Sequence, residues 1–482
     1  MDLSGSRDVI SSLPDDISSH ILSFLPTNEA ASTSVLSKKW RYLFAFVPNL
    51  DLDDSVYLNP ENETEISTSF MDFVDRVLAL QGNSPLHKFS LKIGDCIDPV
   101  RIIPWINNVL ERGVSDLDLH LNLESEFLLP SQVYLCKTLV WLKLRFGLYP
   151  TIDVEDVHLP KLKTLYIEAT HFEEHGVGLT KLLSGCPMLE DLVLDDISWF
   201  IWDFASVSVP TLKRLRFSWQ ERDEFPNSVL LDTPNLVYLK FTDTVAGKYP
   251  KVNLDSLVEA HIDLRLLKPL LINYHQGYGE NDMVGNATDF IMRICNVKTL
   301  YLSANTLQVL TYSCDAIPIF NNLTHLTIES NPRVGWQSVP GLLKNSPNLE
   351  TLIFQGLIHK ATYRCGDVCL CKKPRKEILS CLSSSPVKVI KILKFGENSD
   401  DMEKQREQIK YFLETMPNLE KMILYYNTPS VEDVTEVSSR LQRLVSKVAS
   451  STCIVQLISD NLSLSSTVST NGLLFFKGTS PV

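Results

Sequence analysis

The chain has 482 residues, 45 lysines and arginines against 58 aspartates and glutamates, a net charge of −13 and 44% hydrophobic residues. This apolar fraction is typical of a folded protein, and the acidic balance argues against a dedicated nucleic-acid binder, which needs cations to neutralise phosphates. The first residues are polar and no stretch reaches about eighteen consecutive apolar residues, so we expect neither a secretory signal nor a membrane span. The ten cysteines are therefore expected as reduced thiols inside the cell, in the cytoplasm, the nucleus or both.

The first fifty residues predict three short helices. Residues 13–16 (Leu-Pro-Asp-Asp) are typical of a helix start, because proline fits the first turn and acidic side chains favour the positive end of the helix dipole. Apolar residues follow at helical spacing until Pro26, and further helical stretches are expected over residues 30–36 and from residue 37 onward. Three helices in about forty residues bury too little apolar surface to be comfortably stable alone, so we expect a partner to cover them.

A repeat of the form apolar-x-x-apolar-x-apolar occupies most of the remaining chain. Its copies begin at Leu86, Val114, Leu139, Leu162, Leu189, Leu212, Leu236, Leu257, Val297, Leu323, Leu349, Val387 and Leu419. Between Leu139 and Leu257 a copy begins every 21 to 27 residues, within the range of about 20–29 residues found in leucine-rich repeats. The last two apolar positions alternate with polar ones, which predicts short parallel strands. Helical or irregular segments, which we call returns, would connect each strand to the next. The sequence therefore predicts an α/β fold, a small helical module followed by a leucine-rich-repeat solenoid over residues 80–360.

Two intervals between consecutive copies are too long for a single repeat. They run from Leu257 to Val297 and from Leu349 to Val387. Each predicts either an extruded loop that carries function or a degenerate repeat with a solvated loop, and both alternatives stay open.

Three segments near the start carry a family resemblance. Residues 13–17, 21–26 and 34–41 resemble the F-box of the plant F-box/FBD/leucine-rich-repeat families, with residues 35–41 (Val-Leu-Ser-Lys-Lys-Trp-Arg) the most specific part. One departure is Lys39, where relatives more often carry arginine. Residues 381–388 and 412–420 resemble the FBD domain that closes many of these proteins.

The resemblance covers residues 8–458 and implies a domain order. It comprises an F-box at 8–54, the solenoid at 80–360, a Cys/Lys-rich loop at 361–377 and an FBD domain at 378–458 that continues the repeats. Beyond it, the Ser/Thr-rich tail 459–482 is predicted to be disordered.

The same resemblance implies a non-catalytic substrate-recognition subunit of a Skp–cullin–F-box ubiquitin ligase. The F-box would dock on a Skp-type adaptor, and through it on a cullin, while the repeats bind an unidentified target protein. The adaptor-docking residues would be Leu13, Pro14, Ile17, Ile21, Leu22, Leu25, Val35, Leu36 and Trp40. The alternative is an interaction scaffold that has lost the ligase and uses only the solenoid surface.

Target binding is expected on the strand residues that alternate with the inward-facing apolar positions, which we call the ladder. These alternating residues form the exposed surface of a repeat array. The candidates are Trp141, Tyr166, Arg214, Arg216, Tyr238 and Tyr301.

Catalytic and metal chemistry is weakly indicated. His171–His175 matches the His-x-x-Glu-His pattern of inverted zinc peptidases, but nearby glycines favour a solvated turn. Cys365, Cys369, Cys371 and Cys381 lack the paired Cys-x-x-Cys spacing of common zinc sites, so a metal site, a redox-sensitive or disulfide-forming cluster and an ordinary flexible loop are all open, with the loop favoured. We expect no catalytic residue, metal or cofactor, and neither a nucleic acid nor a membrane as partner.

Overall fold

The computed structural model describes residues 12–57, 63–94, 99–122, 127–147, 150–152, 154–172, 177–198, 204–219, 228–266, 285–362, 365–370, 381–396, 402–426, 453–459 and 466–468. Its contacts form two compact units, Met1–Arg222 and Asp223–Val482, and each is described by itself. His175, Cys371, part of the predicted FBD domain and most of the predicted tail lie outside the described residues.

Three short helices open the first unit, as predicted. They are α1 (Asp15–Leu22), α2 (Thr27–Thr33) and α3 (Lys38–Phe44). Pro14 and Pro26 stand directly before α1 and α2, and the Ser37 hydroxyl caps α3 by accepting a hydrogen bond from the Trp40 N–H at 3.3 Å. Leucine and aromatic side chains from α1 and α3 fill the small core between them.

Helix α4 (Glu63–Gln81) ends at Gln81, whose side chain contacts both the short helices and the repeats. The buried Gln81 side chain donates hydrogen bonds to the carbonyls of Phe44 at 3.5 Å and Val47 at 3.1 Å, and accepts one from Arg112 at 2.8 Å. One amide side chain therefore satisfies backbone groups at the end of α3 and ties them to the return of a repeat.

A parallel sheet forms the inner layer of the first unit. Its strands are β1 (Asn49–Asp53), β2 (Lys88–Ile93), β3 (Asp116–Leu121), β4 (Trp141–Phe146), β6 (Thr164–Phe172), β7 (Asp191–Ser198) and β9 (Arg214–Trp219). Each pairs in parallel with the next, so that Leu142, Leu165 and Leu192 lie in one buried row. The stack begins at β1, upstream of residue 80, because Val47, Leu50 and Leu52 already follow the repeat pattern and are buried.

The second unit holds a similar stack. Its parallel strands are β11 (Tyr238–Thr244), β13 (Glu259–Arg265), β14 (Thr299–Leu302), β15 (His325–Glu329), β16 (Thr351–Gln355), β17 (Val389–Phe395), β18 (Lys421–Tyr426) and β19 (Ile454–Ser459). Strand β20 (Ser466–Val468) adds to β19 in antiparallel orientation. The three apolar positions of every predicted copy are at most 4% exposed in both units, which confirms the leucine-rich-repeat prediction.

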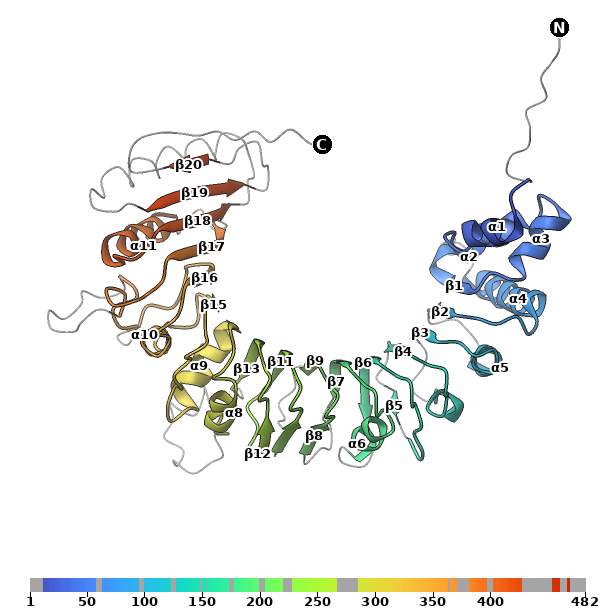
Figure 1. Cartoon of the computed structure of the whole chain (residues 1–482), viewed down its shortest axis with the longest axis horizontal. Coiled ribbons are helices and arrows are strands. Elements are labelled where there is room, and N and C mark those ends of the chain that lie inside the picture. The colour runs from blue at the N-terminus through green and yellow to red at the C-terminus, as the bar shows by residue number, and fades with distance from the viewer. Residues whose placement is uncertain are drawn as a thin grey trace, which may run out of the picture. The chain divides into compact units, whose positions relative to one another are not determined.

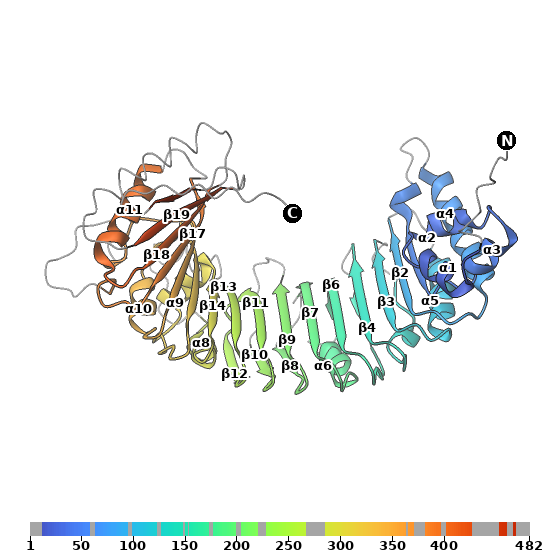
Figure 2. The same cartoon turned by 45° about the horizontal axis from the view of Figure 1, so that its top comes forward.

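The returns differ along the chain. Helices α5 (Pro99–Glu111), α6 (Val177–Ser184), α8 (Thr288–Arg293), α9 (Ala304–Tyr312), α10 (Val339–Lys344) and α11 (Met402–Thr415) fill several of them, with short 3-10 turns η1 (Asp54–Tyr57) and η2 (Ser131–Val133). Others contain the strands β5 (Thr151–Ile152), β8 (Phe204–Ser208), β10 (Ser228–Asp232) and β12 (Lys248–Asn253). In the second unit, α8 to α11 line the same side of the parallel strands (Figures 1 and 2).

Candidate functional site

The helices α1 to α3 expose a cluster of apolar side chains. The exposed fractions run from 36% to 82% for Ile17, Ile21, Phe24, Leu25, Val35 and Leu36. Pro14 is also exposed and Leu13 is half-buried. Seven of the nine predicted adaptor-docking residues are therefore accessible to a partner, and we call these seven together with Phe24 the F-box surface. Sequence reasoning missed Phe24, although it follows Ile21 at a spacing of three residues.

The other two predicted docking residues belong to the core of the helices. Leu22 is 0% exposed and Trp40 is 8% exposed. They are the positions where α1 and α3 pack, so their direct role is to hold the F-box surface together. A helical apolar pattern does not distinguish a residue that faces a neighbouring helix from one that faces a partner.

Lys39 fastens the start of α1 to α3. Its ammonium group donates a hydrogen bond to the Leu13 carbonyl at 2.9 Å and lies 3.3 Å from the Asp15 carboxylate. Arginine, the residue expected at this position from the family resemblance, is also a cation and could make the same two contacts. Because the Asp15 side chain is largely exposed, the ion pair itself adds little stability.

In the first unit, the outward-facing residues of β4 and β6 form an aromatic and charged group. Lys143 lies 4.9 Å and Arg145 lies 5.6 Å from the centre of the Tyr166 ring. The Tyr166 hydroxyl donates to Glu168 at 2.6 Å, and burial, together with that carboxylate, raises the pKa of Tyr166 to about 12. The predicted Trp141 is half-buried on the same strand as Lys143. Tyr166 is thus held as a neutral hydrogen-bonding ring between two cations.

Arg214 and Arg216 extend outward from β9, also in the first unit. Both are exposed. Arg214 makes a bidentate ion pair with Asp191 on β7, which sits directly opposite it in the strand register. A ligand that recruits Arg214 would have to compete with this carboxylate.

In the second unit, Tyr238 and Tyr301 flank His261. The His261 ring stacks on Tyr301 with centroids 5.4 Å apart and lies 5.5 Å from the ring of Tyr238. The Tyr301 hydroxyl donates to Glu329 at 3.0 Å, and burial followed by that carboxylate raises the pKa of Tyr301. Sequence reasoning missed His261, although its place between Ala260 and Ile262 marks it as outward-facing.

Comparison with known proteins identifies the family. A model described as "F-box domain" matches residues 10–51, and one described as "FBD-associated F-box protein At5g56370, LRR repeats" matches residues 103–328. The F-box/LRR-repeat protein At4g14096 of Arabidopsis thaliana is 85% identical over 476 residues, which cover 99% of this chain and 100% of that protein. The chain belongs to the F-box/LRR-repeat family.

Other Arabidopsis members of the F-box/LRR-repeat family are also similar. F-box/LRR-repeat protein At4g14103 is 99% identical over 381 residues, covering 79% of this chain and 100% of that protein. F-box/LRR-repeat protein At3g59200 is 56% identical over 476 residues, covering 96% and 90%. A relative 54% identical over 462 residues has FBD in its name as well. Within the described residues of this family member, no helix is long and apolar enough to cross a membrane.

The cysteine-rich segment of this F-box/LRR-repeat protein separates into two groups. Cys365 and Cys369 lie close to His359, whereas Cys381 donates its thiol to Asp367 at 3.1 Å. Hydrogen bonds from Cys369, and further ones from His359 and Thr362, outweigh burial and hold the pKa of Cys365 well below its usual range. Burial and the Asp367 carboxylate instead raise the pKa of Cys381. The three described cysteines of this segment, Cys365, Cys369 and Cys381, therefore do not act as one set.

The His-x-x-Glu-His motif begins on a strand. His171 is the penultimate residue of β6, and residues 173–176 lie outside the described part of the chain. The zinc peptidases with this pattern place both histidines on one helix face, so the position of His171 gives no support to that chemistry.

Proposed function

We propose that this chain is the substrate-recognition subunit of a Skp–cullin–F-box ubiquitin ligase and supplies no catalytic residue of its own. The observation that carries the proposal is the F-box surface, because it presents eight apolar residues, all of them exposed or half-buried, between Leu13 and Leu36. F-box domains generally bind Skp-type adaptors, and residues 10–51 match that domain. The complex would act inside the cell, in the cytoplasm, the nucleus or both.

The chemistry of the F-box surface fits a groove-binding helical module. Apolar anchors at helical spacing are what an adaptor groove takes up, and their removal from water drives the association. Val35 and Leu36, 82% and 72% exposed, follow α2 directly and contribute the least covered apolar groups of the surface. Leu22 and Trp40 would support docking from inside the module.

Target recognition is assigned to the outward-facing strand residues. Trp141, Tyr166, Arg214 and Arg216 would serve in the first unit, and Tyr238 and Tyr301 in the second. We propose the domain limits 8–54 for the F-box, 80–360 for the solenoid, 361–377 for the loop, 378–458 for the FBD domain and 459–482 for the tail. The first strand of the stack, β1, lies upstream of the solenoid limit, at the end of the F-box range. Strands β17, β18 and β19 extend the parallel stack beyond β16 one after another, which supports an FBD domain that continues the repeats.

Adaptor binding tests the proposal. The full chain is mixed with a purified Skp-type adaptor, and the complex is measured by size-exclusion chromatography and calorimetry. The double variant Ile17→Asp/Leu36→Asp places two charges on the F-box surface without touching the buried Leu22 or Trp40, and we expect binding to fall at least about 100-fold. Ile319→Asp is the matched control, since Ile319 is a 59% exposed isoleucine outside the F-box.

Two results would count against the proposal. If the wild-type chain does not bind the adaptor, the scaffold alternative, in which only the solenoid surface is used, takes its place. If the double variant binds as tightly as the control variant, the F-box surface is not the docking site.

A further inference from the structure

Three metal-ligating side chains meet in the segment that follows β16. The ligand atoms of His359, Cys365 and Cys369 all lie within 4.8 Å of one another. In a tetrahedral zinc site with Zn–S of about 2.3 Å and Zn–N of about 2.0–2.1 Å, neighbouring ligand atoms stand about 3.3–3.8 Å apart. The three side chains therefore need only small rotations to reach zinc-binding distances.

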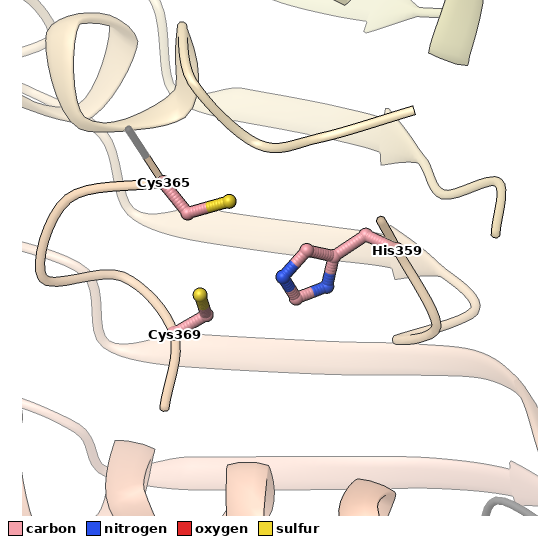
Figure 3. Close-up of side chains that lie close together, drawn as sticks. All are labelled: His359, Cys365 and Cys369. Atoms are coloured by element: carbon pink, nitrogen blue, oxygen red, sulfur yellow. The ribbon is translucent and has the colours of Figure 1, made fainter. Parts of the chain in front are cut away.

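The imidazole of His359 is oriented for this role. Its Nδ1 lies 3.1 Å from the Leu357 carbonyl oxygen. A carbonyl only accepts, so Nδ1 carries a proton and donates it, and Nε2 is the ring nitrogen that can bind a metal once it is deprotonated. Figure 3 shows that far ring nitrogen turned toward the two sulfur atoms. A metal-binding histidine normally has its other nitrogen fixed in this way.

The ring of His359 is also held from its face. It stacks on Trp336 with centroids 3.9 Å apart and an interplanar angle of 12°. Trp336 is fully buried, stacks in turn on Phe354 of β16, and directs its indole N–H toward the Ser330 hydroxyl at 3.3 Å. The ligand ring is therefore positioned by the core of the repeat.

The two cysteines sit in a short loop whose backbone is fixed by its neighbours. Between them, Gly366 has φ +67°, and a Cβ there would meet Pro340 of α10 at 2.6 Å. The loop passes over α10 with no room for a larger residue, and only glycine adopts this turn without strain. Both cysteines are buried, with at most 2% of each residue exposed.

Helix α11 holds the other side of the loop. The Gln408 side chain donates to the Val368 carbonyl at 2.8 Å and accepts from the Leu370 N–H at 3.3 Å. The Tyr411 hydroxyl donates to the Asp367 carbonyl at 2.8 Å. A loop with this many contacts is preorganised, so a ligand that binds its thiols does not first have to order it.

We propose that His359, Cys365 and Cys369 form a structural zinc site that fastens the long connection between β16 and β17. Sulfur and imidazole donors favour zinc over Mg²⁺ or Ca²⁺, which prefer oxygen ligands. A water molecule can take the fourth tetrahedral position. On binding, two thiolate–zinc bonds and one nitrogen–zinc bond form, the protons still held by the ligand atoms are released to solvent, and no oxidant is needed. This replaces the sequence expectation that the cysteine segment holds no metal, and it stands independently of the proposed ligase function.

Metal content and cobalt substitution test the site on the full chain. The protein is purified without chelators and its zinc is measured by mass spectrometry, and then Co²⁺ is titrated into metal-depleted protein. We expect about one zinc per chain and a thiolate-to-cobalt charge-transfer band. His359→Gln and the double variant Cys365→Ser/Cys369→Ser should weaken Zn²⁺ binding at least about 100-fold.

Two variants serve as matched controls. Cys381→Ser keeps a hydroxyl that can donate to Asp367 in place of the thiol, and His325→Gln alters an exposed histidine of β15. Both should bind zinc like the wild type. Far-ultraviolet circular dichroism of every variant checks that the fold is retained.

Several results would overturn the proposal. They are wild-type protein with less than about a tenth of an equivalent of zinc and no cobalt charge-transfer band, or undiminished Zn²⁺ binding by Cys365→Ser/Cys369→Ser. A Cys365–Cys369 disulfide in protein kept under reducing conditions, seen as a mass loss reversed by reductant, would equally contradict it. The wild-type measurements need no variant, so they decide the matter even if a variant misfolds.

Discussion

The F-box helices and the repeat strands place the same kinds of apolar residue in opposite environments. On the F-box surface, the exposed fractions of Ile17, Ile21, Leu25, Val35 and Leu36 lie between 36% and 82%, whereas every apolar position of the predicted repeat copies is at most 4% exposed. A short helix in a three-helix module has too few neighbours to cover all its sides. A strand in a stack is covered by strands on both sides and by its return. Regular apolar spacing therefore places residues in the core of the repeats, whereas in the F-box helices it includes both core residues and residues open to a partner.

The largest effect should come from the repeat ladder. Leu165→Ala removes a fully buried side chain of β6 and should lower the free energy of unfolding by about 3 kcal/mol. Leu36→Ala, on the F-box surface, should change it by less than about 0.5 kcal/mol. Urea unfolding followed by circular dichroism measures both. An equal loss of unfolding free energy in the two variants would contradict the difference between the buried repeat positions and the exposed F-box surface.

The second-largest effect should be on adaptor binding. Val35→Ala/Leu36→Ala should lower affinity for a Skp-type adaptor by about 2 kcal/mol, close to 30-fold, because two exposed apolar anchors are lost. Calorimetry with the full chain measures the affinity. Met188→Ala, which shortens an exposed apolar residue of the repeats, should leave it unchanged. A similar loss in Met188→Ala would mean that the adaptor contacts the repeats.

A smaller effect is expected on the outward face of the strands. Tyr166→Phe keeps the ring between Lys143 and Arg145 but removes the 2.6 Å hydrogen bond to Glu168. The free energy of unfolding should fall by about 1 kcal/mol, and adaptor affinity should stay the same. A change in adaptor affinity would show that the outward face of the strands takes part in adaptor binding.

The smallest effect should come from the surface ion pair on the repeats. Arg214→Ala breaks the bidentate contact with Asp191, but the arginine side chain is largely exposed and water screens the pair. We expect a loss of less than about 1 kcal/mol in the free energy of unfolding, and less at high salt. A loss comparable to that of Leu165→Ala would show that charge pairs rather than the ladder hold the strands.

The ladder could be predicted because the repeat is local in sequence. In each copy, the spacing of three and then two residues fixes which side chains turn inward, and all copies from Leu86 to Leu419 follow it. The returns were less predictable. Segments such as 228–232 form strands rather than helices, because short apolar alternation fits either a strand or a turn of helix until its neighbours are known.

Tertiary contacts explain what sequence reasoning could not find. Leu22 and Ile21 are adjacent on one helix, yet one is buried and the other is 42% exposed, since only the packing of α3 decides which side is covered. Sequence reasoning did not link His359 to the cysteines, because five residues with no regular spacing lie between it and Cys365. Its ring reaches the thiols through stacking on Trp336, which belongs to the previous repeat. Neither the packing of α3 on Leu22 nor the stacking of His359 on Trp336 produces a regular spacing of residues that could be recognised in the sequence.

Hydrogen exchange of the full chain, with and without a saturating Skp-type adaptor, tests the central claim most directly. The account predicts slower amide exchange in peptides from α1 to α3 and unchanged exchange in peptides from β4, β6, β7 and β9. Protection of those strands without protection of α1 to α3, or no protection anywhere at saturating adaptor, would contradict it.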